Sequence, residues 1–258
     1  MNEAAELLYT KLFMRITNKF SEVISFRQAT QQSMPFTQNV IEQQFYDYGN
    51  SIARTTEHDH LFKDKRKFLE IVGGVKNFAS KLAKNHLSSY QTSIDASSIV
   101  LAHSILDAAA MDCFKVIKIV APLEDWDPLL KKRQISLEVL KNSNYEEIMM
   151  GKINEYIEEL DGKSLLEKID KLFQICKPPA NFTFIENHKY DRSRIDSINN
   201  LRNEIIHGDG LTTPIDQCDE DIIYMRSTAL FLLGLIFHRY DVKVCPTLYF
   251  EDLKQQNK

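Results

Sequence analysis

An arginine and a histidine lie five positions apart in the stretch from residue 195 to residue 210, IDSINNLRNEIIHGDG. The two residues are Arg202 and His207, and Asn203 directly follows the arginine. A guanidinium binds a phosphate bidentately, an amide adds a hydrogen bond, and an imidazole exchanges protons near neutral pH because its unperturbed pKa is about 6.5. These three side chains could therefore support a reaction at a phosphate ester, and we take them as candidate catalytic residues.

Arg202 stands where an amphipathic helix would normally carry an aliphatic residue. At about 100° per residue, the apolar side chains of this stretch fall on one arc of a helix, and Arg202 falls inside that arc. The residues of the arc are Ile195, Ile198, Leu201, Ile205 and Ile206. Because an unpaired buried guanidinium is costly, the position predicts a buried carboxylate partner, a subunit interface or an anionic ligand.

A ladder of polar side chains runs beside Arg202 on the same predicted helix. Asn199, Asn203 and His207 follow one another in steps of four, so they stack along one flank. Gly208 comes next and is a natural helix stop. We expect Asn199 to support the site and the helix to end at His207.

The residues from Arg202 to His207 resemble the signature of the HEPN superfamily, which is an arginine, a polar residue, three further residues and a histidine. The resemblance implies an all-α helical bundle that dimerises. It also implies a metal-independent ribonuclease of the kind used as a toxin or in antiviral defence, with a site composed of residues from both subunits. Some HEPN toxins carry a tyrosine two residues after the histidine, which a partner enzyme modifies. Here that position is Asp209, so this kind of silencing is in doubt.

A second pair of ionisable residues lies on the most apolar predicted helix, residues 97–121. His103 and Asp107 are one turn apart within its apolar face, and Asp95 or Ser97 is the expected N-cap. The pair could satisfy itself through a structural hydrogen bond. Alternatively, Asp107 or the pair could meet Arg202 across the helix interface and orient its guanidinium. We expect His103 and Asp107 to support the site.

The elements that must position these residues are helices. Gly and Pro are scarce, with 8 and 7 residues among 258, and apolar residues recur every three or four positions. A break is expected at residues 31–35, followed by a second helix that runs to about residue 54. The other predicted helices are 3–30, 65–87, 97–121, 129–143, 145–160, 164–175, 191–207 and 219–240. The fold class is therefore all-α, with an N-terminal helical segment at 1–90 and a HEPN-like helical domain at 91–258.

Composition limits the functions that this chain can have. The net charge of −4 argues against tight non-specific binding of nucleic acid, so any such site must be a local patch. Four widely spaced cysteines indicate reduced thiols, and the N-terminal stretch has the pattern of neither a signal peptide nor a membrane span. We expect a cytoplasmic protein that does not bind membranes.

Two other charged clusters are poorer candidates. Neighbouring side chains diverge in His58-Asp59-His60, and no stretch gathers three or four convergent ligands, so neither a metal nor another cofactor is expected. Lys131-Lys132-Arg133 is the densest basic run and could contact phosphate, but it reads more simply as a solvated face.

Cleavage of RNA by its own 2′-hydroxyl needs a base, an acid and positive charge against the phosphorane. A two-fold dimer would supply two copies of Arg202 and His207, so the sequence predicts a homodimeric endoribonuclease with RNA as substrate. An antitoxin or a sensor protein is a possible further partner. The alternative is a catalytically inactive HEPN-like module that dimerises or binds a nucleotide or a partner protein.

Overall fold

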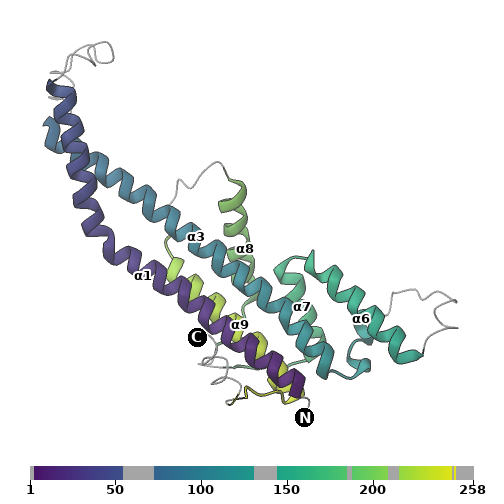
Figure 1. Cartoon of the computed structure of the whole chain (residues 1–258). Coiled ribbons are helices and arrows are strands. Elements are labelled where there is room, and N and C mark those ends of the chain that lie inside the picture. Colours follow the sequence, from purple (N-terminus) through teal and green to yellow (C-terminus); the bar gives the residue numbers. More distant parts are fainter. Residues whose placement is uncertain are drawn as a thin grey trace.

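Two long antiparallel helices form the frame of this computed structural model, which describes residues 3–54, 73–130, 144–184, 188–208 and 215–245, together with residue 247. Helix α1 covers Glu3–Arg54 and helix α3 covers Gly74–Val120. The C-terminal part of α1 and the N-terminal part of α3 extend together beyond the other helices, and we call this part the arm (Figure 1).

The remaining described elements are two short helices and four longer ones. They are η1 (Leu123–Asp125), α4 (Asp127–Leu130), α6 (Tyr145–Asp161), α7 (Leu165–Cys176), α8 (Arg192–His207) and α9 (Cys218–Tyr240). The only extended pairing in the described ranges is an isolated bridge between Phe184 and His188. The predicted all-α class is confirmed.

Helix α3 lies at the centre, and α1, α6, α7, α8 and α9 all contact it. Its side chains Ile99, Leu106 and Phe114 are fully buried in the main apolar cluster. Burial of each such side chain stabilises the fold by about 1.5–3 kcal/mol. These five helices are therefore positioned by the face of α3 that each covers.

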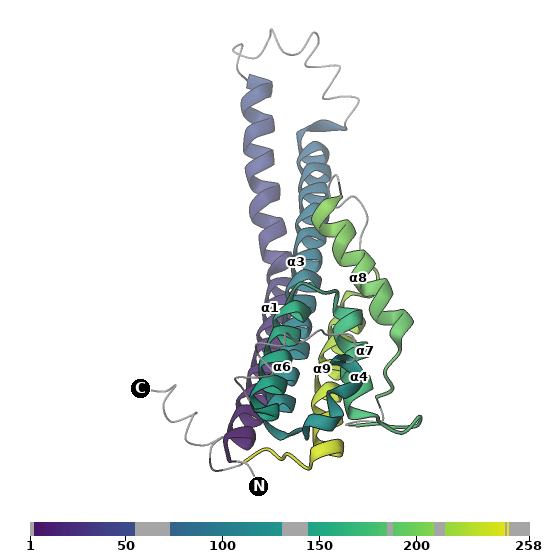
Figure 2. The same ribbon diagram turned by 90° about the vertical axis from the view of Figure 1, so that its right-hand side faces the viewer.

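Helix α9 fills the space that α1, α3 and α7 leave between them (Figure 2). Its length and composition would also suit a membrane span, the one such case in the described part of the chain, but 61% of the most apolar window is buried inside the protein. A core helix passes the same test, so the structure is compatible with a soluble protein. The four cysteines are free thiols, as predicted.

The starts of α6 and α7 follow from two capping boxes. The side chain of Asn144 accepts a hydrogen bond from the backbone N–H of Glu147, and that of Ser164 accepts one from the backbone N–H of Glu167. Each glutamate carboxylate in turn accepts a bond from the backbone N–H of its cap residue. These bonds satisfy N–H groups that the first turn leaves without partners. The helices predicted at 145–160, 164–175, 191–207 and 219–240 are confirmed to within two residues at each end.

The predicted break at residues 31–35 is wrong, because α1 continues through Pro35. A proline inside a helix loses one backbone hydrogen bond and costs about 3 kcal/mol. Here α3 runs alongside both halves of α1. Arg27 pairs with Asp95 before the proline, and the rings of Phe45 and His86 lie 5.1 Å apart after it. Tertiary packing therefore holds the helix together across the proline.

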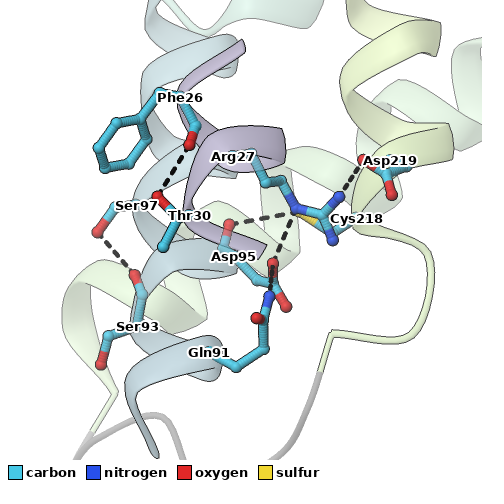
Figure 3. Close-up of polar contacts among 9 residues, drawn as sticks. All are labelled: Phe26, Arg27, Thr30, Gln91, Ser93, Asp95, Ser97, Cys218 and Asp219. Carbon is cyan, nitrogen blue, oxygen red and sulfur yellow. Dashed lines mark hydrogen bonds and ion pairs between the residues drawn. The ribbon is translucent and has the colours of Figure 1, made fainter. Parts of the chain in front are cut away.

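The predicted N-cap at Asp95 or Ser97 is also wrong, because both residues lie inside α3. The hydroxyl of Ser97 donates to the carbonyl of Ser93, one turn earlier, at 2.8 Å. The Asp95 carboxylate accepts hydrogen bonds from Arg27 and Gln91, both at 2.8 Å (Figure 3). Asp95 is therefore the partner of the distant Arg27 and not a helix cap, and the local sequence does not show this pairing.

Arg27 joins three helices at this point. Its guanidinium is buried, contacts Asp95 of α3 and also pairs with Asp219 in the first turn of α9 (Figure 3). The thiol of Cys218 donates to the backbone carbonyl of Asp95 at 3.5 Å. The cluster fixes the register of α1 and α9 against α3.

The boundary expected near residue 90 falls inside the continuous helix α3. Tyr9 and Phe20, which precede it, share one apolar cluster with Phe114 and Leu233, which follow it. No helix end marks this boundary. The stretches His58-Asp59-His60 and Lys131-Lys132-Arg133 lie outside the residues that the structure describes.

We expect Arg27→Met to lower the free energy of unfolding by about 3–5 kcal/mol, because it leaves the buried Asp95 carboxylate without its cation. Asp219→Asn is the matched control, since the Asp219 side chain is 60% exposed, and it should cost less than about 1 kcal/mol. Urea unfolding followed by circular dichroism measures both. Equal losses in the two variants would contradict the importance assigned to the buried pair.

Candidate functional site

Helix α8 carries the candidate catalytic residues and has a defined start. The Asp191 carboxylate accepts hydrogen bonds from the backbone N–H groups of Ser193 and Arg194, at 2.9 and 3.3 Å. The hydroxyl of Tyr224 on α9 accepts a further bond from the backbone N–H of Asp191 at 2.7 Å. The N-terminal end of α8 is therefore attached to α9.

The helix ends at His207, as predicted, but not through a left-handed glycine. Gly208 has an extended backbone, with φ −78 and ψ 158, and its N–H donates to the carbonyl of Glu204 at 2.7 Å. A Cβ atom at this position would lie 2.4 Å from that carbonyl oxygen. Glycine is required here because of close approach to the backbone.

The apolar arc predicted for this helix is confirmed for its first turns only. Ile195 and Ile198 are buried, and Leu201 and Ile205 pack partly against the core. Ile206 is 42% exposed, contrary to the prediction. Helix α8 thus leaves the core in its last turn, and that turn projects beside the arm (Figure 1).

A cleft of about 380 Å³ lies between α8 and the frame. Three of the six candidate residues line it, namely Arg202, His103 and Asp107. The other lining residues come from α1, α3 and α6: Arg15, Ser104, Ala108, Met111, Asp112, Lys115 and Asp161. The structure therefore brings the predicted α3 pair and the predicted arginine to one site.

The guanidinium of Arg202 is only partly satisfied. Its Nη1 donates to the side-chain oxygen of the neighbouring Asn203 at 2.9 Å, while its Nε is buried without a hydrogen-bond partner. Among the described residues no carboxylate lies within ion-pair distance of it, although the other cationic wall residues, Arg15 and Lys115, both pair with Asp112. The sequence left three explanations for Arg202: a buried carboxylate partner, a subunit interface or an anionic ligand. Within the described residues the structure excludes the carboxylate partner.

Asp107 does not pair with Arg202 or His103, which corrects the sequence-based expectation. Both of its carboxylate oxygens accept from the Nζ of Lys168 on α7, each at 2.8 Å. The Lys168 side chain is only 2% exposed, whereas that of Asp107 is 33% exposed. A buried ammonium needs a close anion more than a partly hydrated guanidinium does, so Lys168 takes the carboxylate.

His103 pairs with α8 instead of with its neighbour on α3. Its Nε2 lies 3.2 Å from the side-chain oxygen of Asn199, and the residue is buried. Burial lowers the pKa of His103, and the nearby positive charge of Arg202 lowers it further. These surroundings favour the neutral form of His103, and the expected His103–Asp107 hydrogen bond is not formed.

The predicted polar ladder divides among different partners. Asn199 contacts His103, and Asn203 contacts Arg202. His207 is exposed at the tip of the helix and does not line the cleft. One chain therefore presents Arg202 in the cleft and His207 outside it.

Lys168 is the site residue that sequence reasoning missed, although a signal for it exists. Around the axis of α7, Lys168 falls between Leu172 and Ile175, which are both buried. The phase argument that identified Arg202 would have identified Lys168 as a cation on an apolar face. Its partner Asp107 was already known to be a carboxylate on an apolar face of α3.

Comparison with known proteins assigns no family to this chain. No family model matches the chain, and no curated protein or solved structure matches it. The likeness to the HEPN signature therefore depends on residues 202–207 and on their position at the exposed end of a helix. What the site can do must be argued from its own side chains.

The two members of the Asp107–Lys168 ion pair should differ in how much their replacement lowers the free energy of unfolding. Asp107→Ala should lower the free energy of unfolding by about 3–5 kcal/mol, because it strands the Lys168 ammonium in the core. Lys168→Met should cost less, since methionine fills much of the same volume and the Asp107 carboxylate keeps contact with water. Thermal and urea unfolding test the order. A larger loss for Lys168→Met would contradict this account of the pair.

Proposed function

We propose that this protein is a metal-independent endoribonuclease of the HEPN type that acts in the cytoplasm as a homodimer. The observation that carries the proposal is the state of Arg202, which lines a cleft with a buried Nε that has no partner and no ion pair among the described residues. A guanidinium in this state favours an anion that brings its own acceptor oxygens. A phosphodiester supplies those oxygens.

The proposed reaction uses the ribose hydroxyl next to the bound phosphate. A base takes the proton of the 2′-hydroxyl, and the oxygen forms a bond to phosphorus while the bond from phosphorus to the 5′-oxygen breaks. An acid gives a proton to that leaving oxygen, and the products carry a 2′,3′-cyclic phosphate and a 5′-hydroxyl. Arg202 and Asn203 counter the charge of the phosphorane, and His207 takes one of the two proton-transfer roles.

An inactive binding module is the second candidate, and the exposure of His207 outside the cleft favours it. In that case Arg202 would bind the phosphate of a nucleotide or of RNA without proton transfer. The two candidates differ in what they require of His207. A module tolerates His207→Asn, whereas a ribonuclease does not.

Cleavage should persist in excess EDTA and should stop when the ribose at the cut site is replaced by deoxyribose. We expect Arg202→Ala to slow cleavage by about 10²–10³-fold and His207→Ala by about 10²–10⁴-fold. Arg192→Ala on the same helix and His238→Ala on α9 are matched controls, because both residues are exposed and neither lines the cleft. Purified variants are compared on a defined oligonucleotide, with the cyclic phosphate identified by mass spectrometry.

Dependence on magnesium, cleavage of the deoxy substrate or full activity in His207→Ala would contradict the ribonuclease mechanism. RNA binding that is lost in Arg202→Ala and kept in His207→Asn, without cleavage in any sample, would support the module instead.

A dimer contact at the tip of α8 is supported by the exposed Ile206, which lies one turn beyond Arg202 on the same side of the helix. Ile206→Asp should weaken self-association by tenfold or more, which is about the effect of losing one well-packed apolar contact. Ile223→Asp is the matched control, because Ile223 is a 54% exposed isoleucine on α9. Light scattering measures both. A wild-type monomer at micromolar concentration with RNA present would contradict the composite site.

A further inference from the structure

His103 lies in the same cleft as Arg202 and belongs to the same chain. It projects from α3, whereas Arg202 projects from α8, so the interface between these two helices holds both groups together. The signature on α8 supplies the proposed ribonuclease with only one histidine per chain. The structure adds a second histidine beside Arg202, whose Nε has no hydrogen-bond partner among the described residues.

The contact with Asn199 on α8 favours one tautomer of this histidine. The side-chain oxygen of Asn199 lies 3.2 Å from Nε2 of His103 and accepts hydrogen bonds, so the tautomer with its proton on Nε2 suits this contact. When the ring is neutral, Nδ1 then holds a free lone pair. Nδ1 has no hydrogen-bond partner within the described residues, so it is available to accept a proton.

The surroundings of the ring favour its neutral form. Burial has the largest effect on the pKa of His103 and lowers it, and Arg202 on α8 lowers it further. Asp107 on α3 and the hydrogen bond to Asn199 raise this pKa, while Lys168 on α7 adds a smaller lowering effect. A base must be unprotonated before it acts, and a lowered pKa keeps it so at neutral pH. The environment of His103 thus suits a proton acceptor.

We propose that His103 is the general base of the reaction, taking the 2′-hydroxyl proton onto Nδ1 while Arg202 of the same chain holds the phosphate. This inference rests on the proposed function and deepens it. The 2′-oxygen forms its bond to phosphorus as His103 becomes an imidazolium, and His207 gives the proton that the leaving 5′-oxygen takes up. One chain then supplies both the phosphate-binding cation and the base.

A purely structural role would make His103 a link between α3 and α8 and nothing more. His103→Gln separates the two roles, because the glutamine amide can donate to Asn199 but has no basic nitrogen. Asn199→Asp leaves the histidine in place and puts a carboxylate beside Nε2. That substitution should raise the pKa of His103 by stabilising the imidazolium.

The first arm of the test is the pH dependence of cleavage. In the wild type the rate should rise with pH through the pKa of His103, which lies below the ordinary value of about 6.5. His103→Gln should keep wild-type thermal stability, lose about 10²–10⁴-fold in rate and lose this acidic limb. Asn199→Asp should move the limb to higher pH.

The second arm needs no catalysis. Proton resonances of the His103 ring are followed against pH in the full-length protein, with and without inorganic phosphate. Phosphate bound at Arg202 offsets the positive charge and should raise the pKa of His103. Arg202→Gln should raise this pKa without phosphate and abolish the response to phosphate.

The outcomes separate the inference from the proposed function. Cleavage by the wild type with full activity in His103→Gln would overturn the role of His103 and leave the ribonuclease standing. No cleavage by any sample would overturn the ribonuclease and with it the base. A phosphate response of His103 in that case would assign the cleft to anion binding, whereas no response would also remove Arg202 from phosphate binding.

Discussion

The structure depends on one constraint, which is that α3 lies against five other helices and carries three ionisable side chains that need partners on those helices. Asp95 is satisfied by Arg27 of α1, His103 by Asn199 of α8, and Asp107 by Lys168 of α7. Each contact joins a different helix to α3 at one position along its length. The polar contacts therefore set the register of the bundle, while the apolar side chains supply most of its stability.

The sequence predicts those helices best whose ends carry local signals. Helices α6 and α7 begin at capping boxes, and α8 ends at a glycine that no other residue could replace without a backbone clash. The same reasoning fails along α1 and α3, because Pro35 is a local stop signal and Asp95 is a local start signal. Packing along two helices of 52 and 47 residues outweighs one lost hydrogen bond, and a buried Arg27 needs Asp95 more than a helix end does.

Three residues of the candidate cleft were predictable from the sequence, but their pairing was not. Phase around the helix axis identified Arg202, His103 and Asp107, and all three line one cleft. The pairing was beyond a single sequence, since it depends on which of two cations, Arg202 or Lys168, is more deeply buried. Lys168 is the more deeply buried, so it takes the carboxylate and leaves Arg202 without one among the residues that the structure describes. Exposure of Ile206 was likewise unpredictable, because the last turn of α8 passes the edge of the core.

The Nε of Arg202, which has no acceptor among the described residues, bears directly on the proposed reaction. A buried Nε without an acceptor costs about 1–3 kcal/mol, which an entering phosphate oxygen can recover. Before the phosphate arrives, the positive charge of Arg202 helps to keep His103 neutral. Once the phosphate is bound, its charge offsets that of Arg202, so His103 becomes more basic when a base is needed. The imidazolium formed by proton transfer then lies beside the phosphorane and adds a second positive charge against it.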